Sequence, residues 1–301
     1  MLDSLSTLDT TFLRNLNDIS DRMQRAQNQM SSGLRVQKPS DAPDEIGRML
    51  QLRASLDGNA QARTNLGRVK AEVDGAESSL QSAATILDSV RSLGTEGATD
   101  FTTAEARQGL AVQVDALLQN LVGLAQTKVD GRFVFSGDSD GIAPYTYDAS
   151  QTPPVSLYAG SPSTRQIGLP NGQKIPVALT AQQIFDSPVP ENNVFGAVIA
   201  LRDALEANDG TGITNAVAQI GSASTYLNGQ LAFYGTAQNQ VAQGLNDADT
   251  QEVQMKSELS GIEDADIASA ILELQSATTQ QSAALSARAQ MPRTTLFDYL
   301  K

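Results

Sequence analysis

The chain has 301 residues, a formal net charge of −13, and no Cys, His or Trp. Without Cys there is no disulfide framework or thiol nucleophile, and without His the usual general base and the commonest transition-metal ligand are missing. The acidic charge disfavours nucleic acids and anionic membranes as partners, and no run of about 18 apolar residues predicts a membrane-spanning helix.

The first predicted helix covers about residues 7–30 and carries an apolar seam. Its apolar residues recur at spacings of three and four, which place them on one helix face. They are Leu5, Phe12, Leu16, Ile19, Met23, Ala26 and Met30. A seven-residue repeat of this kind is typical of a coiled coil. Gly33 is expected to end the helix in a left-handed C-cap.

A loop with Pro39 and Pro43 separates this helix from two more. A long second helix is expected over about residues 44–93, ended by Gly94 and Gly97, and a third over about residues 103–128. Strict heptads support both predictions. In the second helix they contain Leu66, Val69, Val73, Ala76, Leu80, Ala83, Leu87 and Val90, and in the third Leu110, Val114, Leu117, Leu121 and Leu124.

The composition changes sharply after the third helix. Eight of the eleven prolines lie between Pro144 and Pro190. Short strands are expected at residues 133–135, 155–158 and 175–179, between turns rich in Gly, Pro, Asp and Asn. The sequence therefore predicts a small β-rich insertion over residues 131–190. Because it lies between helical segments, we expect it to project as a knob.

Helix returns over about residues 194–205 and again over residues 213–262, where the longest apolar seam lies. At about 1.5 Å per residue, that last helix would be on the order of 75 Å long. The heptad phase then breaks near Asp266 and restarts at Ile267. A break of phase marks a joint or a change of packing partner. The new apolar set is Ile267, Ala270, Ile271, Leu274, Ala277, Ala284 and Leu285, with Met291 in the same phase.

The two breaks fall at comparable distances from the two ends of the chain. We therefore predict a mainly α fold, an elongated antiparallel helical bundle or coiled coil formed by the N- and C-terminal regions, with a small β-rich insertion domain. The terminal helices, residues 1–43 and 262–301, would form a polymerisation core. Residues 44–130 and 191–261 would form a rod. The joint between them would contain Gly33, Pro39, Pro43, Asp264 and Asp266.

The terminal seams also predict assembly. Each is a thin apolar stripe. The C-terminal stripe contains Ala270, Ala277 and Ala284, and burial of such small side chains yields little hydrophobic free energy per residue. The seams can pack on each other within one chain or between chains. We expect contacts between subunits, made by the two apolar sets given above.

Two short motifs resemble the bacterial flagellin family. Ser31-Ser32-Gly33-Leu34-Arg35 is similar to the SSGLR motif that follows the first helix of flagellins. Ile262-Glu263-Asp264-Ala265-Asp266 is similar to the IEDAD motif that opens their last helix. Both motifs lie at the predicted joints.

Three further segments are similar to the hook-associated branch of that family, whose members occupy the hook–filament junction. They are Lys38–Pro43, Gly131–Gly137 and Leu296–Leu300. By contrast, Gln290-Met291-Pro292 is closer to flagellin tails. The resemblance therefore implies a structural adaptor between hook and filament, and flagellin itself remains the alternative.

The resemblance also implies partners and a location. The partners would be other copies of the chain in a ring or helix, a second hook-associated protein, flagellin and a flagellar export chaperone. The protein would be extracellular, in the flagellum at the hook–filament junction. It would leave the cell by type III export without a cleaved signal peptide, and residues 1–11 indeed lack a basic segment followed by an apolar stretch.

Catalytic interpretations are weaker. We expect no enzyme activity, no cofactor and no metal. Glu263, Asp264 and Asp266 are better explained as anions at a helix N-terminus than as an acid–base pair. Asp138 and Asp140 begin like a calcium loop, but no terminal Glu follows at the required spacing. An enzyme in the insertion would have to use polar groups whose spacing specifies no reaction: Tyr145, Tyr147, Asp148, Tyr158 and Lys174.

Overall fold

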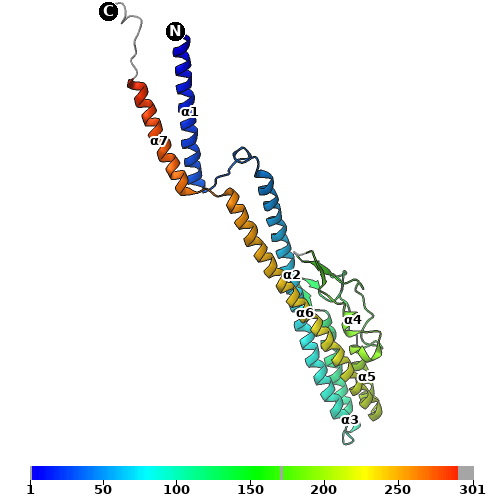
Figure 1. The fold of residues 1–301 in the computed structure, drawn as a ribbon. Helices are drawn as coiled ribbons and strands as arrows, with labels where there is room; N and C mark the ends of the chain where they lie inside the picture. The colour runs from blue at the N-terminus through cyan, green and yellow to red at the C-terminus, as the bar shows by residue number, and fades with distance from the viewer. Residues whose placement is uncertain (1, 170–171, 291–301) are drawn as a thin grey trace, which may run out of the picture. The chain divides into compact units, whose positions relative to one another are not determined.

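The structure is a computed structural model that describes residues 2–169 and 172–290, with side chains from residue 9 onward. Most of the described chain is helical (Figure 1). The α-helices are α1 (Leu2–Ser32), α2 (Ile46–Gly97), α3 (Ala104–Ala125), α4 (Ala181–Phe185), α5 (Val194–Glu206), α6 (Gly210–Glu263) and α7 (Ile267–Gln290). The shorter elements are the 3-10 turns η1 (Pro39–Asp41) and η2 (Pro190–Asn192) and the strands β1 (Lys128–Val129), β2 (Arg132–Phe133), β3 (Gln166–Gly168) and β4 (Lys174–Pro176). The prediction of a mainly α fold with a small β-rich insertion is confirmed.

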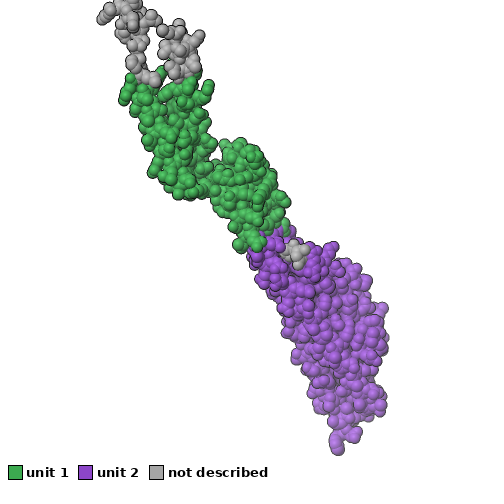
Figure 2. Space-filling model, in the orientation of Figure 1, with its two compact units in different colours: residues 1–58, 252–301 green, residues 59–251 purple. Residues whose placement is uncertain are grey.

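The chain forms two compact units, which Figure 2 shows in two colours. Unit 1 comprises residues 1–58 and 252–301, and unit 2 comprises residues 59–251. Helices α2 and α6 contribute residues to both units. The division into three parts that we derived from the sequence stays a prediction.

The ends of α1 and α2 test the two glycine predictions. Gly33 has a φ of +72° and its N–H donates to Gln29 O at 2.8 Å, so the left-handed C-cap of α1 is confirmed. Of the two glycines predicted to end α2, Gly97 is the last residue of the helix, whereas the prediction for Gly94 is wrong because α2 continues past it. A Cβ atom at Gly94 would lie 2.7 Å from Val217 Cγ2. Gly94 therefore permits a close approach between helices and does not terminate one.

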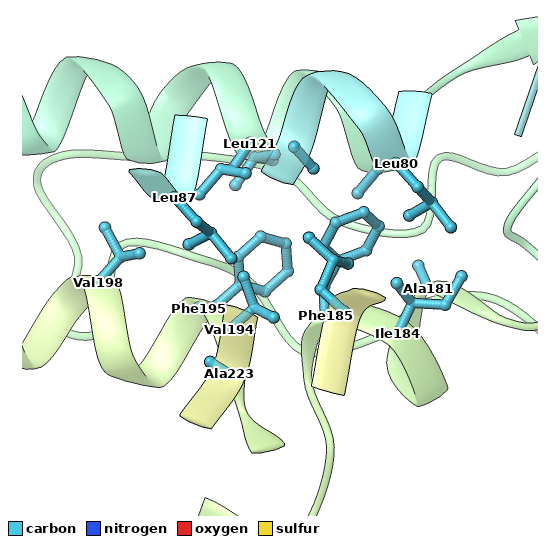
Figure 3. Close-up of a cluster of buried hydrophobic side chains, with 14 of the residues drawn as sticks. Leu80, Leu87, Leu121, Ala181, Ile184, Phe185, Val194, Phe195, Val198 and Ala223 are labelled. Carbon is cyan, nitrogen blue, oxygen red and sulfur yellow. The ribbon is translucent and has the colours of Figure 1, made fainter. Parts of the chain in front are cut away.

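Unit 2 has one hydrophobic core built on the predicted seams. Leu66, Val73, Leu80 and Leu87 of α2 are buried, and so are Ile213, Ile220, Leu227, Tyr234 and Val241 of α6. Helices α3 and α5 pack against each other. Figure 3 shows where these helices meet, with Leu80, Leu87 and Leu121 around Phe185 and Phe195. The rings of Phe185 and Phe195 are stacked, with their centroids 5.5 Å apart.

The insertion is less strand-like than predicted. β1 pairs with β2 and β3 with β4, both antiparallel, and Val155 makes only an isolated bridge with Tyr147. Helix α4 was not predicted, although Thr180 and Gln183 form a capping box at its start. This helix is short, and Pro188 and Pro190 follow it closely, so its apolar residues show no helical period.

The insertion does not project as a separate knob. Its apolar side chains belong to the core cluster of unit 2, among them Phe135, Tyr145, Ile184 and Phe185. Hydrogen bonds join it to the helices: Leu179 N–H donates to the Tyr234 hydroxyl at 3.0 Å, and Gln126 Nε2 donates to Tyr145 O at 2.7 Å. The sequence pattern missed this because apolar residues in irregular segments have no period that reveals which face they bury.

Candidate assembly interface

The terminal helices α1 and α7 pack side by side within unit 1 (Figure 1). Ala26 of α1 and Ala270 and Ala277 of α7 are the buried residues of this contact. Small side chains let two helix backbones approach closely, but each buries little apolar area. The contact within the chain is therefore close and weakly apolar.

Polar pairs along the edge of the two helices indicate an antiparallel pairing. Arg22 Nε lies 2.6 Å from Glu273 Oε1, near the joint, and Arg288 pairs with Asp9 toward the far end. The Arg288 guanidinium also lies over the Phe12 ring, 5.7 Å from its centroid. The Arg22 hydrogen bond lowers the pKa of the Glu273 carboxyl. Exposed ion pairs contribute little to stability, so these contacts mainly fix the register.

Several large apolar side chains of the helix pair remain exposed to solvent. Four belong to the predicted interface set: Met30, Ile267, Ile271 and Leu285. Leu13 and Leu272 are also exposed, Leu272 by 66%, and neither was predicted. They lie outside the strict heptad phase, and only the packed pair reveals that their faces stay open. The pair thus carries an apolar surface that nothing in the chain covers among the described residues.

The remaining predicted interface residues lie in or beside the seam between the helices. Phe12, Leu16, Ile19, Met23, Leu274 and Ala284 are half-buried. The side chain of Leu5, Met291 and the ending Leu296–Leu300 lie outside the described residues. The assignment of this set to contacts between subunits stays a prediction.

The joint consists of two segments that interrupt the helices and pair through their backbones. Leu34 and Asp264 form an antiparallel bridge. Arg35 N–H donates to Glu263 O at 2.6 Å, and Ala265 N–H donates to Gly33 O at 2.8 Å. These bonds satisfy backbone groups that the helix ends leave unpaired. Gly33 and Asp264, both predicted at the joint, thus lie at this crossing.

Two carboxylates order the loops on either side of the crossing. Asp41 Oδ2 accepts from Lys38 N–H at 2.8 Å and from Gln37 N–H at 3.0 Å, which lowers the pKa of Asp41. Asp266 accepts from the Ser269 hydroxyl at 2.9 Å and from Ala268 N–H at 2.9 Å, which lowers the pKa of Asp266. Asp266 therefore caps the N-terminus of α7.

The remaining predicted joint residues are the two prolines. Pro39 begins the turn η1, and Pro43 follows it before α2 begins. Both occupy the loop between α1 and α2. Neither could be part of a helix interior without the loss of a backbone hydrogen bond.

A small apolar cluster underlies the joint loop. It contains Val36, Ala42 and Met49, with Leu259 and Ile262 of α6 packed against them. In the same unit, the side chain of Arg53 pairs with Glu263, which is buried. The loop is therefore anchored on the first turns of α2 and the last turns of α6, although its sequence shows no helical or strand period.

The polar groups considered for an enzyme in the insertion do not converge. Tyr145 donates to Asp186 at 3.2 Å, Tyr147 donates to Asp115, and Tyr158 donates to Phe135 O at 3.2 Å. Burial and the Asp115 hydrogen bond raise the pKa of Tyr147 to about 12. Tyr147 thus ties the insertion to α3, whereas Tyr145 and Tyr158 make their hydrogen bonds within the insertion.

Asp148 and Lys174 do not complete a site with these tyrosines. Asp148 accepts from Ser150 N–H at 2.9 Å in a local turn, and Lys174 lies on β4. Within residues 2–169 and 172–290, no group of three or more acidic side chains is placed to hold a metal ion. Over the same residues, no helix is long and apolar enough to cross a membrane.

Comparisons with known proteins match the two parts of the chain that contain the terminal helices and the joint segments. Residues 6–140 match the bacterial flagellin N-terminal helical region, and residues 217–300 match the bacterial flagellin C-terminal helical region. A flagellin of Clostridium tyrobutyricum is 27% identical over 115 residues, which are 38% of this chain. Flagellin B of Helicobacter pylori is 26% identical over 157 residues, or 52% of the chain. The chain spans only 30% of the length of each of these relatives.

Solved structures with the same fold are matched over almost their whole length. A structure from Vibrio parahaemolyticus that bears the description of a flagellar hook-associated protein has a TM-score of 0.66 at 19% identity, covering 74% of this chain and 100% of that one. Hook-associated protein-3 of Legionella pneumophila has a TM-score of 0.61 at 15% identity, covering 70% and 98%. Bacillus cereus FlgL has a TM-score of 0.58 at 18% identity, covering 70% and 99%.

Proposed function

Because this chain belongs to the bacterial flagellin family, we propose that it is a structural subunit of the flagellum that joins the hook to the filament. The observation that carries this proposal is the extent of the fold match. Three solved structures described as hook-associated or FlgL proteins match this fold over 98% to 100% of their length, with TM-scores of 0.58 to 0.66. A flagellin-family chain with the fold of these structures best fits the adaptor role.

The proposed mechanism is mechanical and rests on the terminal helices. The α1–α7 pair leaves Ile271, Leu272 and Leu285 exposed, and apolar area of this kind is stabilised by removal from water. Copies of the chain around a ring or helix would cover these side chains. The terminal helices would then form the polymerisation core, and the long helices of α2 and α6 the rod outside it.

The remaining partners are proposed from the same family membership. They are flagellin on one side, a second hook-associated protein on the other, and an export chaperone before assembly. The protein would reach the hook–filament junction by type III export. No catalytic, cofactor or metal role is part of this proposal.

The alternative is flagellin, the filament subunit. It is supported by the curated relatives, which are flagellins at 26% and 27% identity. The two roles predict different distributions along the flagellum, because a filament subunit is present over the whole length and a junction subunit in one short zone.

Immunogold electron microscopy of intact flagella tests the proposal. The antibody should recognise residues 141–190, which lie outside both flagellin-matched regions. The expected result is one gold cluster per flagellum where hook meets filament. Cells that produce Leu272→Asp provide the control, since this chain should fold but should not enter flagella. Label along the whole filament would replace the adaptor role by flagellin, and flagella without label would refute both.

A further inference from the structure

A cavity with three arginines lies where the insertion meets α2. It has a volume of about 230 Å³. Arg68, Arg132 and Arg165 line it together with the apolar side chains of Val69, Ile167 and Val177. We refer to it as the arginine pocket. Ligand pockets for drug-sized molecules are commonly about 300–1,000 Å³, so this pocket suits a few side chains better than a cofactor.

The arginine pocket has more guanidinium donors than it has acceptors to satisfy them. Arg165 pairs with Glu72 at 3.1 Å, but its Nε is buried and has no hydrogen-bond partner among the described residues. Arg132 lies 3.6 Å from Asp140, and Arg68 forms no ion pair within the described part of the chain. In a protein with a formal net charge of −13, this cluster is a local region of positive charge, which favours the binding of a carboxylate group.

The turn between α2 and α3 has the complementary chemistry. Phe101 is 97% exposed, and the neighbouring Asp100 and Glu105 are exposed acidic side chains that form no ion pair with any described residue. Hydrogen bonds order the turn: the Thr102 hydroxyl donates to Glu96 O at 2.8 Å, and Arg107 Nε donates to Gly97 O at 2.8 Å. We refer to residues 96–105 as the acidic turn. An ordered turn loses less conformational entropy on binding than a mobile loop.

The acidic turn cannot reach the arginine pocket of its own chain. Arg68 and Gly97 lie on the same straight helix α2, and at about 1.5 Å per residue they are roughly 44 Å apart. Figure 1 shows the α2–α3 turn at one end of unit 2 and the strands of the insertion toward the other end. Any contact between the two therefore joins two copies.

We infer that the arginine pocket of one copy receives the acidic turn of a second copy. The carboxylates of Asp100 and Glu105 pair with the guanidinium groups, and the Phe101 ring contacts the apolar lining and stacks on an arginine. The two surfaces are different, so the contact is heterologous, and repetition of it produces a ring or a helical row. It also relieves the repulsion between copies of an acidic protein.

The absence of Cys from the sequence makes a disulfide test clean. One full-length chain carries Ala104→Cys within the acidic turn, and an isotopically labelled chain carries Gln166→Cys at the arginine pocket. The two are mixed, oxidised and analysed by mass spectrometry. The expected result is a disulfide between labelled and unlabelled chains, in excess over the disulfides of either variant alone.

Matched variants assign the crosslink to the inferred contact. Arg68→Glu should lower the yield by about tenfold or more, which corresponds to a loss of about 1.4 kcal/mol in contact free energy, whereas Arg91→Glu on the same helix should not change it. Phe101→Ser should lower the yield, whereas Val112→Ser, at another exposed apolar position, should not.

Two results overturn the inference. One is the lack of a mixed disulfide. The other is a mixed disulfide whose yield does not change when Arg68→Glu or Phe101→Ser is introduced. A pocket that binds only small anions would give this second result. The contact goes beyond the proposed junction role and is tested separately from it. Chains that assemble on hooks without this crosslink would refute the contact and leave the junction role standing.

Discussion

Substitution of Gly94 by alanine tests whether position 94 holds glycine because two helices pack closely there, and not because a helix ends there. Alanine is favoured over glycine in a helix interior by about 1 kcal/mol. Against this gain, a Cβ atom at Gly94 would lie 2.7 Å from Val217 Cγ2 and 3.0 Å from Leu201 Cδ2. Carbon atoms in favourable contact are about 3.5–4.0 Å apart.

The surrounding side chains determine which effect is larger. Val217 is β-branched and lies within α6, where such a side chain has one strongly preferred rotamer and cannot turn away. Leu201 is fully buried. Overpacking of such a site typically costs about 1–3 kcal/mol, which equals or exceeds the helix-propensity gain. Gly94→Ala is therefore expected to destabilise unit 2 by up to about 2 kcal/mol.

Gly67→Ala is the matched control on the same helix. A Cβ atom at Gly67 has no neighbour within 4 Å, so this variant should stabilise the protein by about 1 kcal/mol. Both are measured by thermal unfolding of the full chain, followed by far-UV circular dichroism. For a domain of this size, each kcal/mol shifts the midpoint by about 2–4 °C. If both variants raise the midpoint equally, the close-packing explanation of Gly94 is refuted.

Three further predictions concern assembly, the joint and the insertion. Leu272→Asp should change the free energy of unfolding by less than about 0.5 kcal/mol because Leu272 is exposed, yet it should abolish sedimentable assemblies; assembly at wild-type levels would contradict this. Hydrogen bonds lower the pKa of Asp266. The cap that Asp266 forms therefore stabilises α7 fully at pH values above 3.8, the ordinary pKa of this side chain, and is lost as the pH falls through the lowered pKa. The loss of helical circular dichroism between about pH 5 and pH 2 should therefore be smaller in Asp266→Asn, which keeps a capping side chain without the titrating group. Tyr234→Phe leaves Leu179 N–H without its acceptor and should cost about 1–3 kcal/mol in urea unfolding; a change near zero would show that water replaces the hydroxyl.

The structure also changes how the terminal seams are interpreted. The sequence left open whether they pack within a chain or between chains. In the structure, Ala26, Ala270 and Ala277 are buried in the α1–α7 contact, while Ile267 and Ile271 from the same predicted set remain exposed. The small residues of each seam therefore serve the pairing within the chain, and the large exposed ones remain available to neighbouring copies.

Periodic features could be predicted from the sequence alone. The helices α1, α2, α3, α5 and α6 were predicted with boundaries within about five residues, since a heptad seam such as Leu66, Val73, Leu80 and Leu87 fixes both the helix and its buried face. The joint was also visible, because Gly33 and the phase break at Asp266 are local signals. The helical fold follows from these features, and the family resemblance comes from the motifs at Ser31–Arg35 and Ile262–Asp266.

Features that depend on contacts between distant residues required the tertiary structure. The role of Gly94 depends on Val217 and Leu201, which lie on other helices, and nothing local separates it from a helix-ending glycine. The burial of Phe135 and Phe185 depends on how irregular segments fold onto the bundle. The arginine pocket joins α2 residues to insertion residues about a hundred positions apart in the sequence. Local propensity and period are properties of neighbouring residues, whereas close approach, burial of irregular segments and clusters of charge arise only when distant segments meet.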